Sequence, residues 1–164
     1  MALIAVVAGS LAASSPANAV QRWHVLENIY WPNECLDVNP HTWFDNPGYV
    51  SLYPCHEDIQ QRWYTAAPVG EIRTIGPPYG PANKCLDAWP DPTYPHGFRV
   101  STWDCNGGAQ QQWSWQTVDL PSRSILINVK FNLCLDTTTD SGSLGLYSCH
   151  ANHNQQWRQR RSGT

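Results

Sequence analysis

The feature that most constrains the fold is a pattern of residues that occurs three times along the chain. The sequence N-x-C-L-D occupies residues 33–37, 83–87 and 132–136, so that successive copies lie 50 and 49 residues apart. An aromatic residue two positions before a second cysteine follows each copy, and then a Q-x-W triplet. In chain order, these later positions are Tyr53, Cys55 and 61–63; Trp103, Cys105 and 111–113; and Tyr147, Cys149 and 155–157. A period of this length predicts three similar units that pack against one another.

Short strands joined by turns are the expected secondary structure. The chain has 164 residues, which fits one domain, and 13 prolines and 11 glycines separate its short apolar runs. This spacing favours many short strands over long helices. We therefore expect an all-β fold.

The strand that precedes each second cysteine is predicted to have one core face and one outer face. Val50 and Leu52 alternate with more polar neighbours, and Tyr53 belongs to the second set. Successive side chains on a strand point to opposite faces, so the ring of Tyr53 should point away from the core. The same alternation surrounds Trp103 and Tyr147.

The six cysteines should form three equivalent disulfides, because the sequence pattern is threefold. Two pairings respect this symmetry. Pairing within each copy gives Cys35–Cys55, Cys85–Cys105 and Cys134–Cys149, which is the simplest set. Pairing between copies gives Cys55–Cys85, Cys105–Cys134 and Cys149–Cys35. Zinc is disfavoured because the chain has no C-x-x-C pair.

A disulfide between directly opposed residues of a hairpin would also fix the other facing pairs. If Cys35 opposes Cys55, then Asp37 opposes Tyr53. The same arithmetic pairs Asp87 with Trp103 and Asp136 with Tyr147. Each copy is thus predicted to hold an exposed carboxylate beside an exposed ring. This arrangement suits a sugar, because a carboxylate accepts hydroxyl hydrogen bonds while a ring covers an apolar face.

Another interpretation keeps these residues purely structural. The aspartates would then accept hydrogen bonds from nearby backbone amides, and the aromatic rings would cover the disulfides.

The C-L-D and Q-x-W patterns resemble those of the ricin-type β-trefoil lectins, which include the family 13 carbohydrate-binding modules. The resemblance covers nearly all of residues 20–164 and implies a β-trefoil of three four-stranded repeats, approximately 20–66, 67–117 and 118–160. It also implies that Trp63, Trp113 and Trp157 pack beneath the sugar pockets. The residue before each Q-x-W and its glutamine are implied sugar contacts.

The resulting prediction is a lectin for galactose-type or related sugars, with up to three shallow pockets. The candidate sugar-binding residues are Asp37, Tyr53, Gln60, Gln61, Asp87, Trp103, Gln110, Gln111, Asp136, Tyr147, Asn154 and Gln155. The alternative function is a non-catalytic subunit that binds another protein or delivers a toxin. A glycosidase is disfavoured because the repeats occupy nearly the whole chain and only four glutamates occur. We expect no cofactor and no metal.

The first 19 residues are typical of a secretory signal peptide. An apolar run at 3–13 is followed by Ala17-Asn18-Ala19, which fits a small-x-small cleavage pattern, although no Lys or Arg precedes the run. The run is too short to span a bilayer core of about 30 Å, which needs about 20 residues. A secreted, extracellular protein is therefore expected.

The charges and histidines add no further site. The net charge of −3 argues against a nucleic-acid partner. Arg158, Arg160 and Arg161 are interpreted as a solvated tail. His150 and His153 have a spacing compatible with metal binding, but a solvated loop is the favoured interpretation.

Overall fold

The computed structural model describes residues 23–66, 68–75, 83–119 and 122–161, and these form twelve strands and four short 3-10 helices. The strands are β1 (Trp23–Asn28), β2 (Glu34–Val38), β3 (Val50–Pro54), β4 (Trp63–Thr65), β5 (Val69–Thr74), β6 (Lys84–Pro90), β7 (Phe98–Asp104), β8 (Gln112–Asp119), β9 (Arg123–Asn128), β10 (Leu133–Thr137), β11 (Leu144–Tyr147) and β12 (Trp157–Arg161). The helices are η1 (Ile59–Gln61), η2 (Pro95–Gly97), η3 (Ala109–Gln111) and η4 (His153–Gln155). No helix in these ranges is long and apolar enough to cross a membrane.

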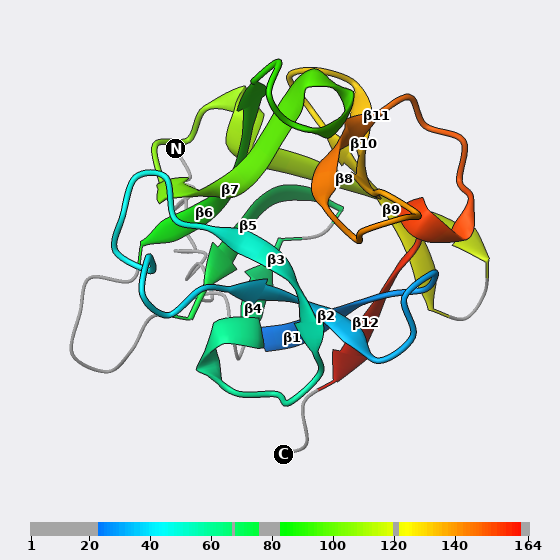
Figure 1. Ribbon diagram of the computed structural model, residues 1–164, viewed down its shortest axis with the longest axis horizontal. Helices are drawn as coiled ribbons and strands as arrows, with labels where there is room; N and C mark the ends of the chain where they lie inside the picture. The colour runs from blue at the N-terminus through cyan, green and yellow to red at the C-terminus, as the bar shows by residue number, and fades with distance from the viewer. Residues whose placement is uncertain (1–22, 67, 76–82, 120–121, 162–164) are drawn as a thin grey trace, which may run out of the picture.

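Six strands close into an antiparallel barrel, and three hairpins extend from it (Figure 1). The barrel order is β1, β4, β5, β8, β9 and β12, and β12 pairs back with β1 to close the ring. The hairpins β2–β3, β6–β7 and β10–β11 are joined to β1, β5 and β9, respectively. Each third of the chain therefore contributes two barrel strands and one hairpin pair, and the fold is the expected β-trefoil.

The Q-x-W tryptophans lie in the core, as the family resemblance implied. Trp63, Trp113 and Trp157 are completely buried. Each indole N–H donates to a backbone carbonyl of the neighbouring hairpin, at 2.9 Å, 2.9 Å and 3.2 Å in chain order. The acceptors are the carbonyls of Leu36, Leu86 and Leu135. Because the leucine belongs to the C-L-D motif, one hydrogen bond per repeat ties the two sequence motifs together.

The disulfides lie within the repeats. Their Cα–Cα distances are 5.1 Å for Cys35–Cys55, 5.0 Å for Cys85–Cys105 and 5.1 Å for Cys134–Cys149. The between-repeat alternative is therefore wrong.

The predicted hairpin register is also wrong, by two residues. Cys35 opposes Tyr53, and Asp37 opposes Ser51. The other hairpins show the same shift, with Asp87 opposite Ser101 and Asp136 opposite Gly145. The reason is that Cys55 lies beyond the end of β3, where its N–H donates to the Asn33 carbonyl at 2.8 Å. The disulfide thus joins diagonally placed residues.

The basic residues near the C-terminus are part of the barrel rather than a solvated tail. Arg158 lies on β12, and its guanidinium donates to buried Glu27 of β1 at 2.6 Å and 3.0 Å. The backbone N–H of Asn33 donates to the other oxygen of Glu27 at 3.1 Å. This cluster links the first and last strands of the barrel. Burial alone would raise the pKa of Glu27, but these donors and the charges of Arg158 and Arg160 outweigh it and hold the pKa below its usual value.

Candidate functional site

Each hairpin carries an aspartate and an aromatic ring on its outer face, but the two are not equally exposed. Tyr53, Trp103 and Tyr147 are 56%, 36% and 44% exposed, in agreement with the predicted alternation. Asp37, Asp87 and Asp136 are only 7%, 5% and 2% exposed, so the expectation of exposed carboxylates is wrong. Asp37 and Asp136 line cavities with their rings, and so the carboxylates form the floor while the rings form a wall.

The glutamine of each Q-x-W supports the aspartate and the turn behind it. The Gln111 amide donates to Asp87 at 2.7 Å, and the Gln155 amide donates to Asp136 at 2.7 Å. The carbonyl oxygen of each glutamine accepts the backbone N–H of the residue after the second cysteine, at 2.9 Å for Gln61, 2.8 Å for Gln111 and 2.9 Å for Gln155. All three glutamines are completely buried, which makes them positioning residues for the pocket.

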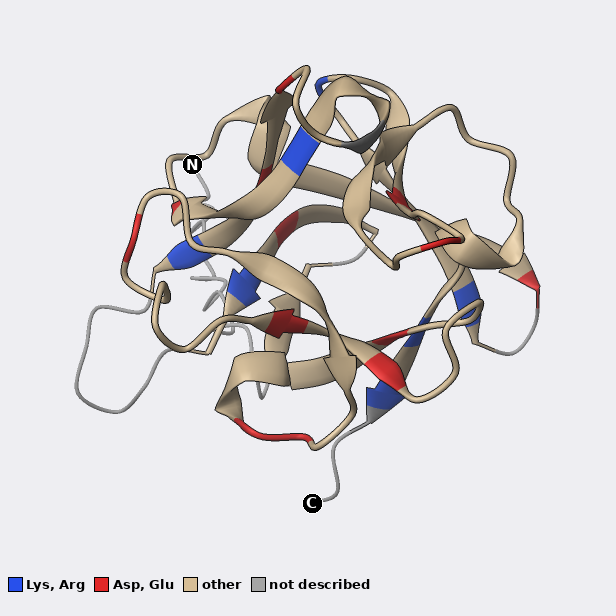
Figure 2. Cartoon of the chain, viewed as in Figure 1, with Lys and Arg blue, Asp and Glu red and all other residues tan. Residues whose placement is uncertain are grey.

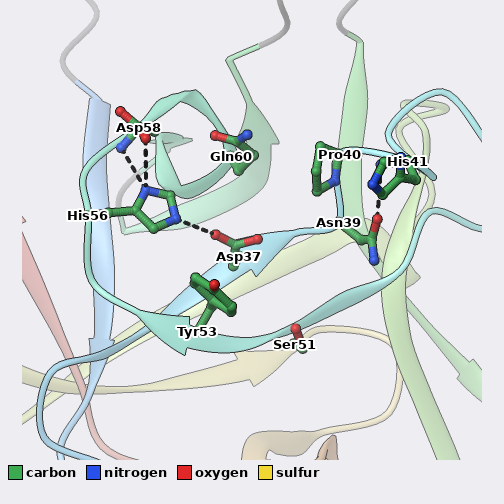
Figure 3. Close-up of a pocket in the computed structure, with 9 residues that line it drawn as sticks. All are labelled: Asp37, Asn39, Pro40, His41, Ser51, Tyr53, His56, Asp58 and Gln60. Atoms are coloured by element: carbon green, nitrogen blue, oxygen red, sulfur yellow. Dashed lines mark hydrogen bonds and ion pairs between the residues drawn. The ribbon is translucent and has the colours of Figure 1, made fainter.

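The first pocket is a cavity of about 390 Å³ between β2, β3 and the segment that follows Cys55 (Figure 3). It is lined by Asp37, Asn39, Pro40, His41, Ser51, Tyr53, His56, Asp58 and Gln60. The His56 ring lies between two carboxylates, with Nε2 3.2 Å from Asp37 and Nδ1 3.4 Å from Asp58. Asp37 and Tyr53 therefore share one cavity although they are not opposed in register.

The hydrogen bonds of His56 fix its neutral tautomer. Nδ1 accepts the backbone N–H of Asp58 at 3.1 Å, so that the ring proton lies on Nε2 and faces Asp37. His150 repeats the geometry, since its Nδ1 accepts the N–H of Asn152 at 3.2 Å and its Nε2 lies 3.6 Å from Asp136. In the second repeat Asn106 replaces the histidine, and its side-chain oxygen accepts the Gly108 N–H at 2.8 Å.

The third pocket, a cavity of about 510 Å³, receives a residue from the second repeat. His96 of η2 lies 3.7 Å from Asp136, and its ring centroid is 4.3 Å from that of Tyr147. The Asn154 amide donates to both oxygens of Asp136 at 3.1 Å. Asp136 thus meets imidazoles on two sides and amides from the Q-x-W region on a third.

Desolvation dominates the electrostatics of all three aspartates. Burial raises the pKa of Asp37, Asp87 and Asp136 above the ordinary 3.8. Hydrogen bonds from Gln61, Gln111 and Gln155 act in the opposite direction without reversing the shift. Each of these buried carboxyl groups nevertheless offers oxygens that can accept hydrogen bonds from hydroxyl donors.

The sequence prediction identified the floor and the ring of each pocket but missed the histidines. His56 and His150 directly follow the second cysteine in their repeats, and aligning the repeats would have exposed this signal. The interpretation of His150 as a solvated loop residue is corrected, because it lines the third pocket. His96 carries no comparable signal, because the topology alone brings it to another repeat.

In the described ranges, neither the metal-like cluster nor the distribution of basic residues indicates a metal site or a nucleic-acid site. Glu71, Cys85 and Cys105 form the one cluster there with metal-like spacing, and both cysteines are oxidised in one disulfide. Apart from β12, the basic residues are spread over the cartoon rather than gathered in a stripe (Figure 2).

Several solved structures resemble the fold of this chain. The designed threefold-symmetric protein ThreeFoil is 22% identical with a TM-score of 0.68, over 84% of this chain and 96% of that one. The β-trefoil lectin of the Vibrio vulnificus hemolysin/cytolysin, with N-acetyl-D-lactosamine bound, is 16% identical with a TM-score of 0.66, over 89% and 98%. An exo-β-1,3-galactanase from Clostridium thermocellum is 18% identical with a TM-score of 0.70, over 90% of this chain and 31% of that one. These likenesses show the fold.

The family of the chain follows from its sequence. No curated protein matched the chain. The family model described as the ricin-type beta-trefoil lectin domain matches residues 22–157, which is most of the chain. Together with the twelve-stranded trefoil, its three disulfides and its buried Q-x-W tryptophans, this match shows that the chain belongs to the ricin-type β-trefoil lectin family.

Proposed function

We propose that the protein is a secreted lectin that binds galactose-type or related sugars through its hairpin pockets. One observation carries the proposal: a buried aspartate lies beneath an exposed ring and beside a histidine ring in both the first and the third repeats. The carboxylate accepts hydroxyl hydrogen bonds, the ring covers the apolar C–H face, and the imidazole adds a polar contact. Family membership supports a carbohydrate-binding role.

The choice of galactose-type sugars draws on the solved neighbours. One is a lectin with N-acetyl-D-lactosamine bound, and another is an exo-β-1,3-galactanase. Secretion is supported by the disulfides, which persist in oxidising compartments. The proposed signal segment, 1–19, lies outside the described residues.

We infer weak binding at each pocket. Covering about 100 Å² of apolar sugar surface contributes roughly 2–3 kcal/mol, and ordering and desolvation offset most of it. Single-site dissociation constants on the order of 0.1–1 mM follow. Three sites on one rigid body should raise avidity for a polyvalent glycan by roughly 10²-fold.

The test is glycan-array and calorimetric binding by oxidised protein spanning residues 20–164. The parent is compared with Asp37→Asn, Asp87→Asn and Asp136→Asn combined, which keeps the shape and an acceptor oxygen but removes the charge. The matched control combines Glu34→Gln, Asp45→Asn and Asp119→Asn, which removes the same charge away from the two cavities. We expect the pocket variant to lose at least tenfold in affinity while the control keeps it.

Two results would contradict the proposal. A folded parent that binds no glycan would exclude a lectin and would favour the protein-interaction alternative. Equal glycan binding by the folded pocket variant would show that the sugar binds elsewhere.

A further inference from the structure

The hairpin of the second repeat is longer than the other two, and its extra pairs continue the outer face that carries Asp87 and Trp103. The β6–β7 ladder runs past Asp87–Ser101 to Trp89–Arg99 and Pro90–Phe98. The corresponding ladders end one pair after the aspartate, at Val38–Val50 and Thr137–Leu144. Residues two apart on a strand share a face, so Trp89 and Arg99 lie on the same face as Asp87.

Arg99 has no charged counterpart in the other repeats. Continuing their registers by two residues leads to Asn39 with Tyr49, and to Thr138 with Ser143. Backbone hydrogen bonds of 2.9 Å confirm both pairs. A cation at this place is therefore specific to the second repeat and is not required by the fold.

The guanidinium of Arg99 lies over two aromatic rings. It is 4.9 Å from the Tyr94 ring centroid and 5.5 Å from that of Trp89. Trp89 in turn packs edge to face on the pocket ring Trp103, with centroids 5.9 Å apart. Stacking of this kind holds the planar cation in place while leaving its N–H groups free to donate.

The same guanidinium has no acceptor among the residues that the structure describes. No carboxylate lies within 4.0 Å of it, and no hydrogen bond from its N–H groups is formed there. Hydrogen bonds from Thr93 are the main cause of the lowered pKa of Asp91, and the positive charge of Arg99 adds a smaller contribution at longer range. A fixed arginine with unused donors is suited to a planar or tetrahedral oxyanion.

We propose that the second repeat is an anionic-glycan site, in which Arg99 binds a carboxylate or sulfate ester on the ligand. This inference rests on the proposed lectin function. The neutral sugar unit occupies Asp87 and Trp103, and the anion belongs to a neighbouring unit. Arg99 lies two residue pairs beyond Asp87 in the ladder, about 7 Å along the strand, so it is beside the Asp87 site rather than within it.

The experiment isolates the second repeat with Asp37→Asn and Asp136→Asn combined. Three ligands are titrated by NMR in low salt: a neutral galactose-terminated disaccharide, its uronic-acid analogue and its sulfated analogue. We expect one or both anionic ligands to bind about five- to tenfold more tightly than the neutral one. The preference should weaken in 0.5 M salt, because the cation is partly exposed.

Variants of Arg99 identify the cause. In the same background Arg99→Met should reduce the anionic-to-neutral affinity ratio to about one, and Arg99→Lys should retain part of it. Arg123→Met removes the same charge from β9 and should leave the ratio unchanged. Thermal unfolding of each variant checks that the fold is intact.

The outcomes separate this inference from the function on which it rests. A preference for the uronate alone, or for the sulfate alone, supports the site and names its anion. Neutral binding with no anionic preference, or a preference that survives Arg99→Met, overturns the site and leaves the lectin proposal standing. If neither the background variant nor the parent binds any of the three ligands or any other glycan, both the anionic-glycan site and the lectin proposal are overturned.

Discussion

At the residue scale, one histidine in the first and third repeats both accepts a hydrogen bond in the turn and faces the pocket aspartate. His56 accepts a backbone N–H through Nδ1 and presents Nε2 to the pocket. Asn106 fills the turn role in the second repeat with its side-chain oxygen. Turn formation therefore needs an acceptor at this position, whereas the imidazole is an addition made in two repeats.

This division of roles predicts different effects for two substitutions. His56→Asn keeps a turn acceptor, so its free energy of unfolding should change by less than about 1 kcal/mol. It removes the imidazole, so sugar affinity at the first pocket should fall about three- to tenfold. His56→Ala loses both and should also destabilise the fold. Calorimetric titration and chemical denaturation check these effects, and an unchanged affinity in His56→Asn would remove the imidazole from the site.

Individual residues were predictable where the pattern repeats and not where tertiary structure decides. The aspartate and ring positions recur in sequence, and the structure places Asp37 and Asp136 with their rings in cavities. The depth of the aspartates was not predictable, because it depends on the glutamine and loop that fold over them. His96 reaches the third pocket from another repeat, and no local pattern encodes that contact.

At the element scale, the turn after each hairpin contains a left-handed residue two positions past the second cysteine. Its φ is 59° at Glu57, 73° at Gly107 and 54° at Ala151. Glycine adopts this conformation without a side-chain clash, whereas other residues do so at a cost of about 1–2 kcal/mol. The second repeat thus uses the residue that the turn favours, and the other two tolerate strain.

The left-handed position of this turn predicts that adding a methyl group there and removing one have opposite effects on stability. A Cβ at residue 107 would meet no atom within 4 Å, so the effect of Gly107→Ala would be conformational. We expect it to lower the free energy of unfolding by about 0.5–1 kcal/mol, and Ala151→Gly to raise it by a similar amount. Urea denaturation of both variants is the measurement. Changes of the same sign in both would show that the backbone angle is not the cause.

The hairpin register shows what sequence arithmetic can and cannot establish for an element. The existence of the hairpin and the outward direction of Tyr53 followed from alternation. The predicted register was wrong because it assumed that each disulfide joins directly opposed residues. Asn33 adopts φ 66° just before β2, and its carbonyl binds the N–H of Cys55 outside the ladder. A two-residue shift preserves every facing direction, so the alternation pattern could not reveal the error.

At the scale of the whole molecule, the three hairpin aspartates contribute a common pH dependence. The pKa of Asp37, Asp87 and Asp136 is raised in the fold, so between 3.8 and the raised values the native state holds more protons than the unfolded state. Their contribution to stability is thus complete below 3.8 and is lost as pH rises through the raised values. Glu27, with a lowered pKa, acts in the opposite direction and loses its contribution as pH falls below its ordinary 4.5.

Sugar affinity and the aspartates' contribution to the free energy of unfolding should therefore change in opposite directions as the pH falls toward 3.8. Acidification protonates the pocket aspartates, which should weaken sugar binding while it removes the penalty for burying their charge. Glu27 is present in both the parent and the combined Asp→Asn variant, so its contribution cancels when their free energies of unfolding are subtracted. We expect the parent-minus-variant difference in unfolding free energy to grow in the parent's favour as pH falls through this window. Thermal unfolding and glycan binding from pH 3.5 to 7 test both trends, and parallel trends would contradict the assignment.

The pairing of β1 with β12 means that the barrel does not dictate which repeat comes first in the chain. His24 lies opposite Arg161, so the start of the first strand and the end of the last are hydrogen-bonded neighbours. A short linker could join them, and the backbone could be opened instead at a connection between two repeats. Such a circular permutant would contain the same barrel and hairpins. The architecture is thus a ring of three segments in fixed cyclic order, and the barrel could be threaded from the start of any one of them.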